Sequence, residues 1–278
     1  YLDTRGGRLL DLAGAGSGQA VDIALGLDDL LVSYGLDVPP TAPLSAAREL
    51  LPAHEHAAAA LARNVELSRA LLDWLGNAGD LYKPVQRHWR LGRAHWDLLL
   101  ELEGCALMTV APSQMPLTGV SVKLQIPDAP HRSLLAGGWL EVWILSQLRG
   151  IRAEGRAIVD DAARGVRIVA RGAEREIDCL AVRRGVPIIA SIKAGSRRPW
   201  QKAYIDELVA VGKLLGDNYC TLLFVASWPL PSQADRARAA AFSEHASRGR
   251  VVVYTGADMP DAATWLRREV LQPTISGN

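Results

Sequence analysis

The chain has 278 residues, 49% hydrophobic and 22% charged, a composition that fits two compact globular domains and excludes a disordered or fibrous protein. Its net charge is only +1, but residues 146–202 carry thirteen lysines and arginines against six acids, whereas residues 1–60 carry eight acids against three arginines. The three cysteines are scattered, which excludes a disulfide framework and a zinc site with Cys-x-x-Cys spacing. The sequence shows no signal peptide and no apolar run of about 18 residues, so we expect a cytoplasmic protein with no membrane partner.

The first 37 residues have the pattern of the end of a larger domain. Short strand-like segments separated by glycine turns, at 1–4, 8–12 and 20–25, precede a helix-like segment at 27–35. A strand meander this short cannot bury a core alone. Because the first residue is tyrosine rather than methionine, we expect the sequence to be part of a longer chain.

A proline-rich linker at 38–43 leads into a mainly helical stretch. Periodicity predicts helices at 44–52, 54–76 and 91–103, followed by two short strands at 106–110 and 120–126. Helices followed by a small hairpin are typical of a winged helix-turn-helix. The cationic residues between 83 and 95 are interleaved with Trp89 and Trp96 and are candidates for nucleic-acid contact. The alternative is that the tryptophans belong to the core and the cations form a solvated face, in a domain that serves as a spacer or a dimer surface.

The His54-Glu55-His56 sequence does not have metal-ligand spacing. On a helix the two imidazoles point about 200° apart, so they cannot share an ion. We expect exposed polar residues there.

The last part of the chain alternates helices and strands. A buried helix is predicted at 134–148, two strands at 176–182 and 186–192 are joined by an Arg-Arg-Gly turn, and later elements are expected as helix 199–216, strand 219–226, helix 232–247, strand 250–254 and helix 262–271. This alternation predicts an α/β fold whose mixed sheet is covered on both faces.

Three segments of this part place charged side chains where they can meet. Glu141 is the only acid on the helix, Glu176 and Asp178 share one face of the first strand, and Ser191 and Lys193 share one face of the second. Carboxylates of this kind bind hard divalent cations, which polarise a phosphate and lower the pKa of a bound water. The alternative for Glu141 is a solvated helix acid.

The same segments resemble a known family. Gly-Gly-Trp-Leu-Glu at 137–141, Glu-Ile-Asp at 176–178 and the strand that ends at Lys193 are similar to the nuclease half of the CARF-domain PD-(D/E)xK nucleases of type III CRISPR systems. The similarity continues through 203–208 and the strand 220–225, so it covers roughly half of the chain. It implies a restriction-endonuclease-like fold at 131–278, a mainly helical winged-helix-like linker domain at 38–130, and the trailing strands and exit helix of a largely absent CARF-like ligand-binding domain at 1–37.

The resemblance also implies a function. The protein would be a homodimeric, metal-dependent endonuclease that cleaves DNA or RNA in antiviral defence, activated by cyclic oligoadenylate bound to its N-terminal domain. Glu141 and Asp178 would ligate Mg²⁺ or Mn²⁺, and Lys193 would position the water or stabilise developing charge. The basic zone around the site, including Arg197, Arg198, Gln201 and Lys202, would contact the nucleic-acid backbone, unless it is simply a solvated arginine-rich surface.

The sequence departs from the family pattern at Ser191, where an acid normally stands two residues before the lysine. A hydroxyl cannot supply the charge that a divalent ion attracts, which leaves three explanations: two carboxylates and a water suffice, Glu176 supplies the third oxygen, or the site is inactive. The alternatives are therefore another PD-(D/E)xK nuclease of restriction or recombination type, or a nuclease-dead nucleic-acid-binding module. A lysine that the family often has after the tyrosine equivalent to Tyr204 is replaced here by Ile205.

Overall fold

The computed structural model describes most of the chain beyond residue 24. The described ranges are 25–76, 85–89, 93–114, 120–194, 200–228, 230 and 232–272, together with the two-residue strands at 2–3, 8–9 and 19–20. Side chains are described within these ranges except at 74–76, 85–89, 112–114, 120–121 and in the three short strands.

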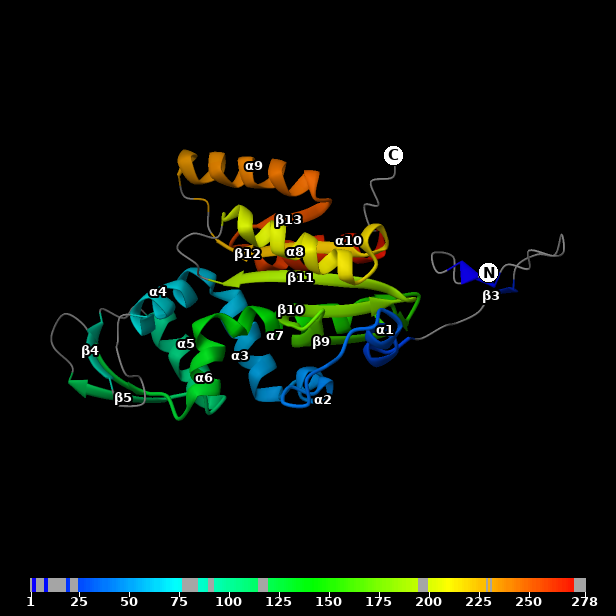
Figure 1. Cartoon of the computed structure of the whole chain (residues 1–278). Coiled ribbons are helices and arrows are strands. Elements are labelled where there is room, and N and C mark those ends of the chain that lie inside the picture. Colours follow the sequence, from blue (N-terminus) through cyan, green and yellow to red (C-terminus); the bar gives the residue numbers. More distant parts are fainter. Residues whose placement is uncertain are drawn as a thin grey trace.

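A five-stranded mixed sheet forms the centre of the molecule, in the order β13-β12-β11-β10-β9. β9, β10 and β11 pair antiparallel, whereas β11, β12 and β13 run parallel (Figure 1). The strands are β9 (Asp161–Ala170), β10 (Ala173–Arg183), β11 (Val186–Ala194), β12 (Thr221–Ser227) and β13 (Val251–Thr255). The α/β expectation and the hairpin between β10 and β11 are confirmed, but the edge strand β9 was not predicted from the sequence.

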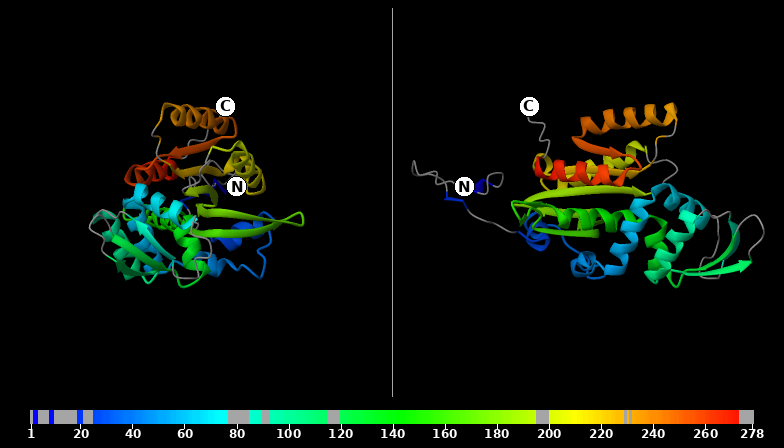
Figure 2. Two further views of the ribbon diagram at one scale, coloured as in Figure 1. Left: turned by 90° about the vertical axis from the view of Figure 1, so that its left-hand side faces the viewer. Right: turned by 180° about the vertical axis from the view of Figure 1, so that it is seen from behind.

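Helices cover both faces of this sheet, each over its own hydrophobic core. One core holds α7 (Trp139–Gly150) and α10 (Met259–Leu271), which lie side by side behind the sheet (Figure 2). The other holds α1 (Leu27–Ser33), α8 (Lys202–Leu214) and α9 (Gln233–Arg248). Apart from shifts of a few residues at their ends, these helices confirm the periodicity predictions.

A helical part with its own small sheet packs beyond α7. It comprises α2 (Leu44–Arg48), α3 (Pro52–Arg63), α4 (Val65–Gly76), α5 (Arg93–Gly104) and the antiparallel sheet β4-β6-β5, with β4 at Val85–Trp89, β5 at Thr109–Gln114 and β6 at Val120–Gln125. The single helix expected at 54–76 is divided at Asn64, which leaves helical geometry (φ −130°, ψ 49°), and β4 was not predicted. Because α3 packs against α7, one hydrophobic core runs from this part into the central sheet, while the winged-helix assignment and the three domain ranges stay predictions.

An ion pair joins α2 and α1 to the edge strand β9. Asp161 accepts hydrogen bonds from Arg48 Nε at 3.0 Å and from the amide of Leu27 at 3.0 Å, and Arg48 also pairs with Asp28 at 2.6 Å. This contact fixes the start of α1 and the end of α2 to the sheet. Burial alone would raise the pKa of Asp161, but the hydrogen bonds from Arg48 and Leu27 lower it below its ordinary value.

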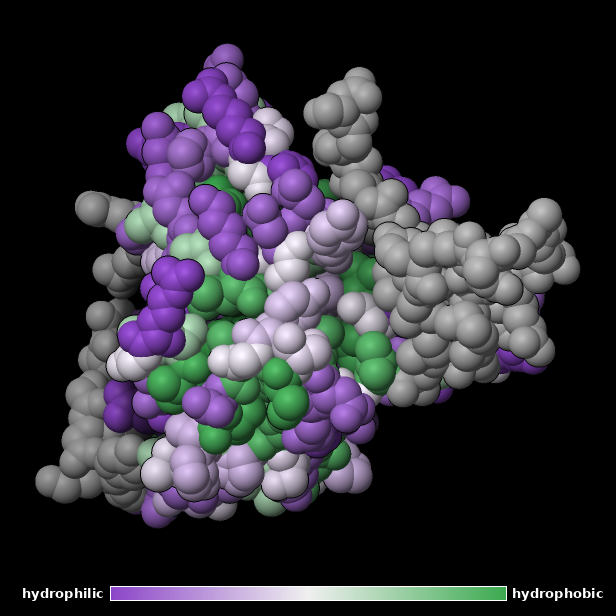
Figure 3. Space-filling model, turned by 45° about the vertical axis from the view of Figure 1, so that its right-hand side comes forward, coloured by the Kyte–Doolittle hydropathy of each residue, from purple (hydrophilic) through white to green (hydrophobic). Residues whose placement is uncertain are grey.

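The N-terminal segment forms a three-stranded antiparallel meander, β1 (Leu2–Asp3), β2 (Arg8–Leu9) and β3 (Gln19–Ala20), which confirms the strand expectation in outline. No helix in the described ranges is long and apolar enough to cross a membrane. Figure 3 shows a face with hydrophobic side chains exposed near its middle. Exposed large apolar side chains of the described residues include Val32, Tyr34 and Tyr219.

Replacing Asp161 by Asn should destabilise the protein by about 1–3 kcal/mol at neutral pH, because Arg48 and the Leu27 amide lose a charged acceptor. Since the pKa of Asp161 is depressed in the folded state, this stabilisation is present above the unfolded pKa and disappears as pH falls through the folded pKa. Urea unfolding of both proteins across the acid range measures the difference. Glu154→Gln, which removes an exposed acid, is the control, and a penalty that persists in strong acid would contradict the ionic explanation.

Candidate active site

The site begins at a distorted turn before α7. The short helix α6 (Ala129–Ser133) continues into a π-type turn, η1 (Leu134–Gly138), in which Gly137 has φ +137°. A side chain at Gly137 would be strained by this φ and would touch Ala194 at 3.5 Å, and a Cβ at Gly138 would lie 3.1 Å from the Ser133 carbonyl. The Gly-Gly pair therefore lets the start of α7 approach the end of β11, where Lys193 lies.

Glu141 occupies the first turn of α7, a helix whose apolar residues are buried in the core. No described residue donates a hydrogen bond to its carboxylate or forms an ion pair with it. Burial and, after it, the negative charge of Asp178 raise the pKa of Glu141 from 4.5 to about 7, against the opposing charges of Arg164 and Lys193. A carboxylate of this kind can attract a cation or exchange a proton near neutral pH.

Asp178 lies where the regular alternation of β10 is interrupted. Ile177 and Leu180 belong to the same core although strict alternation would place them on opposite faces. Opposite Asp178, Gly165 of β9 has φ +58°, and the pairing of β10 with β11 extends only to Cys179 and Ala190. The irregularity therefore points the Asp178 carboxylate toward β11.

All donors to Asp178 in the described part of the chain reach one oxygen. Its Oδ2 accepts from the Ile192 amide at 2.6 Å, from Lys193 Nζ at 2.8 Å and from Ser191 Oγ at 3.4 Å. The side chains of Asp178 and Lys193 are only 22% and 24% exposed, so the pair is well shielded from water. No described residue donates to Oδ1, so as far as the described chain goes its lone pairs are available for a ligand, while Ser191 acts as a neutral donor and cannot replace an acid.

Two adjoining cavities bring these residues together. The larger, about 580 Å³, is lined by Glu141 and Arg164, and the smaller, about 180 Å³, by Asp178 and Ser191. Three side chains line both: Glu176, Lys193 and Tyr204. Lys193 Nζ lies 5.1 Å from the Tyr204 ring centroid, a cation–π distance, so α8 also contributes to holding the ammonium.

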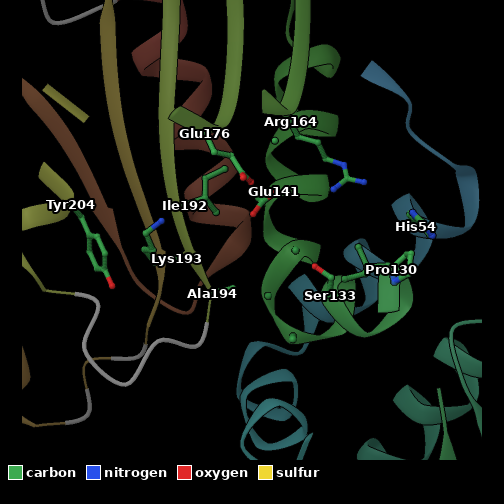
Figure 4. Close-up of a pocket in the computed structure, with 15 residues that line it drawn as sticks. His54, Pro130, Ser133, Glu141, Arg164, Glu176, Ile192, Lys193, Ala194 and Tyr204 are labelled. Carbon is green, nitrogen blue, oxygen red and sulfur yellow. The ribbon is translucent and has the colours of Figure 1, made fainter. Parts of the chain in front are cut away.

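Glu176 extends into the same space from β10. Figure 4 shows its carboxylate and that of Glu141 directed toward each other. Its negative charge is one of those that raise the pKa of Glu141. Glu176 also pairs loosely with Arg167 at 3.5 Å and is 57% exposed, so its carboxylate is less fixed than that of Asp178.

The expected nucleic-acid contacts are only partly described. Arg197 and Arg198 lie outside the described residues. Gln201, just before α8, and Lys202, its first residue, are exposed, and neither lines either cavity.

The structure adds two residues that the sequence did not single out for this site. Arg164 of β9 and His54 of α3 both line the larger cavity, and the prediction of an exposed polar role for His54 is wrong, because its ring is half-buried and packs edge-on against His131 at 5.9 Å. The alternating apolar residues around Arg164 could have indicated the strand. No sequence spacing relates position 54 to position 164.

The donors that could hold a divalent cation are few. No group of three or more His, Cys, Asp or Glu side chains in the described ranges has the arrangement of a metal site. Among the described residues no donor competes for Glu141 and none reaches Asp178 Oδ1, so these two carboxylates fit a hard cation, with Glu176 or water oxygens completing its coordination. The chemistry of the donors favours Mg²⁺ or Mn²⁺ over a softer metal.

Comparison with known proteins identifies the fold. No protein-family model and no curated protein matches the sequence. Among solved structures, Can2 from Sulfobacillus thermosulfidooxidans, in complex with cyclic tetra-adenylate (cA4), aligns over 97% of this chain and 67% of its own with a TM-score of 0.64 and 17% identity. The protein VC1899 from Vibrio cholerae aligns over 100% of this chain and 69% of its own with a TM-score of 0.67 and 18% identity.

The chains share a fold. At identities this low, the likeness shows the architecture alone. The roles of Glu141, Asp178 and Lys193 therefore depend on their own geometry.

Replacing Glu141 by Gln should make the protein about 1–3 kcal/mol more stable at alkaline pH and give no gain at acid pH. The folded pKa of about 7 lies above the ordinary value of 4.5, so the folded state binds the extra proton and loses stability as pH rises between these values. Denaturant unfolding of both proteins at several pH values tests this. Glu154→Gln should leave the pH dependence unchanged, and a Glu141→Gln profile parallel to wild type would contradict a raised pKa.

Proposed function

We propose that the protein is a metal-dependent endonuclease that cleaves phosphodiester bonds in DNA or RNA. The observation that carries the proposal is the pairing of Glu141, a half-buried carboxylate to which no described residue donates, with Asp178, whose Oδ2 is held by Lys193 while no described donor reaches its Oδ1. A purely structural role leaves the Glu141 charge uncompensated, which is costly in a buried position. The resemblance of residues 137–141, 176–178 and 193 to PD-(D/E)xK nucleases points the same way.

In this proposal the chain's residues divide the work. Glu141 and Asp178 would hold a divalent cation, with Glu176 as the candidate third ligand. A bound Mg²⁺ or Mn²⁺ supplies the positive charge that polarises a phosphate and acidifies a water. Lys193, fixed by Asp178 and the Tyr204 ring, places an ammonium beside the reacting phosphate, where it stabilises negative charge as it develops.

The substrate would be recognised through its phosphates. The excess of positive charge at residues 146–202 raises the local concentration of a polyanion around the cavities. Arg197, Arg198, Gln201 and Lys202 follow β11 in the chain and are candidates for backbone contacts beyond the cleaved bond.

We further propose that cyclic oligoadenylate activates the enzyme in type III CRISPR defence. The support is the fold shared with Can2, which was solved with cyclic tetra-adenylate, and the family resemblance of the nuclease part. Residues 1–37 would then be the end of the ligand-binding domain and 38–130 a winged-helix-like linker. The apolar side chains exposed at Val32, Tyr34 and Tyr219 support a homodimer.

Ser191 favours a second candidate, a nucleic-acid-binding module without nuclease activity. Its hydroxyl faces Asp178 Oδ2 where the resembling family has an acid, so the described cluster lacks one fixed negative ligand. A nuclease of restriction or recombination type is the remaining alternative. Such a nuclease would use the same metal-dependent cleavage but would not be activated by cyclic oligoadenylate.

Replacing Asp178 by Asn should abolish Mn²⁺-dependent nicking of supercoiled plasmid and the heat of Mn²⁺ binding, because one of two ionic ligands is lost. Plasmid nicking on gels and calorimetry measure the two effects. Asp258→Asn, which changes a cap at the start of α10, is the matched control and should behave as wild type.

The variant Ser191→Glu separates the enzyme from the binding module. If the wild type does not nick but the Ser191→Glu protein does, the chain is an inactive copy of a nuclease. If neither nicks nor binds Mn²⁺, while plasmid is retained in a salt-sensitive manner, the enzyme proposal is wrong.

Cyclic tetra-adenylate added to the full-length protein should raise the nicking rate several-fold, whereas linear tetra-adenylate should not. Rates measured with and without each compound decide this. A metal-dependent nicking rate that neither compound changes would identify a nuclease of another type.

A further inference from the structure

We infer that Arg164, together with His54, forms an anion subsite beside the acidic cluster, which binds the phosphate of a nucleotide next to the cleaved bond. The inference rests on the proposed function for the identity of its ligand. Its physical basis is the part of the larger cavity that lies beyond Glu141, Glu176 and Lys193 and is lined by Arg164 and His54.

Arg164 is a half-buried cation that no described residue pairs with. Its Nε is inaccessible to solvent and has no hydrogen-bond acceptor, and in the described ranges its guanidinium forms no ion pair. Arg164 nevertheless lines the larger cavity, so an anionic oxygen that enters this cavity can pair with the guanidinium charge. The other arginines of the same strand and hairpin are in different surroundings, since Arg167, for example, pairs with Glu174 and Glu176.

The cavity places this guanidinium opposite the side that holds Lys193. Figure 4 shows Arg164 extending from β9 toward the region of His54, on the far side of Glu141 from Lys193. Two cations thus flank the acids, one on each side. An extended polynucleotide carries phosphates at regular intervals, so a strand with one phosphate at Lys193 can present a neighbouring phosphate to Arg164.

His54 completes the subsite as a neutral donor. Burial and the positive charge of Arg164 lower the pKa of His54, so the imidazole is uncharged at neutral pH and does not repel the guanidinium. The Ser133 hydroxyl lines the same region. A volume of about 580 Å³ is within the range of pockets that enclose ligands, which leaves room for a nucleotide rather than for an ion alone.

The alternative is that Arg164 only balances the charge of Glu141, whose pKa it lowers. The test therefore uses Glu141→Gln as the background, where this role no longer exists and no cleavage occurs. Binding of a fluorescein-labelled single-stranded oligonucleotide is measured by anisotropy in EDTA over a series of salt concentrations. Arg164→Gln and Arg164→Lys are added to this background, with Arg156→Gln, an exposed arginine beyond the other end of α7, as the matched loss of charge.

We expect Arg164→Gln to weaken binding about tenfold or more and to reduce the slope of log K against log salt by about 0.7, the value for one phosphate contact on a single strand. Arg164→Lys should keep the slope and lose part of the affinity, because it keeps the charge but not the planar fork. Arg156→Gln should match the background. Thermal melting confirms that each variant is folded.

Unchanged affinity and slope in Arg164→Gln would overturn the inference, as would an equal loss in Arg156→Gln. Absence of oligonucleotide binding in the wild type and the background alike would overturn it too. If wild type fails to nick plasmid with Mn²⁺ while binding depends on Arg164, the proposed nuclease is wrong and the subsite stands.

Discussion

The burial of α7 is the constraint on which the rest of the molecule depends. Most of its length is apolar and packs between the central sheet, α3 and α10, so the helix has no solvated face over most of its surface. Its single acid cannot avoid this environment. Glu141 is therefore carried into a cavity at the helix start, where burial keeps its pKa near 7.

The backbone around Glu141 has the conformation that places this side chain in the cavity. Gly137 adopts a conformation that side chains disfavour, and the π-type turn that contains it brings α7 against the end of β11. Turns of this kind in helices occur frequently at functional sites. On the sheet side, the interruption at Gly165 and Asp178 turns a carboxylate toward the same place. Two local departures from regular structure thus meet at one point, and a glycine makes each of them possible because it has no Cβ.

Charge around the site is arranged asymmetrically. Lys193 is held by Asp178 and by the ring of Tyr204, whereas Arg164 has no anionic partner in the described structure. The acids between them repel one another, and this repulsion adds to the effect of burial in raising the pKa of Glu141. A cation between the acids and an anion beside Arg164 would relieve both imbalances, and these are the charges that the proposed metal ion and phosphate chain would bring.

The sequence by itself determined the α/β class, the hairpin of β10 and β11 and the helices from α7 onward, because apolar periodicity is a local property of the chain. It also singled out Glu141, Asp178 and Lys193, since charged residues in otherwise apolar elements stand out. It did not determine β9, β4 or the break at Asn64, where short segments follow their tertiary neighbours rather than their own pattern. Only the tertiary structure decided that Asp178 leaves its alternation, that its donors in the described ranges share one oxygen, and that His54 and Arg164, 110 positions apart, line one cavity, because these facts depend on how α3 and β9 pack around α7.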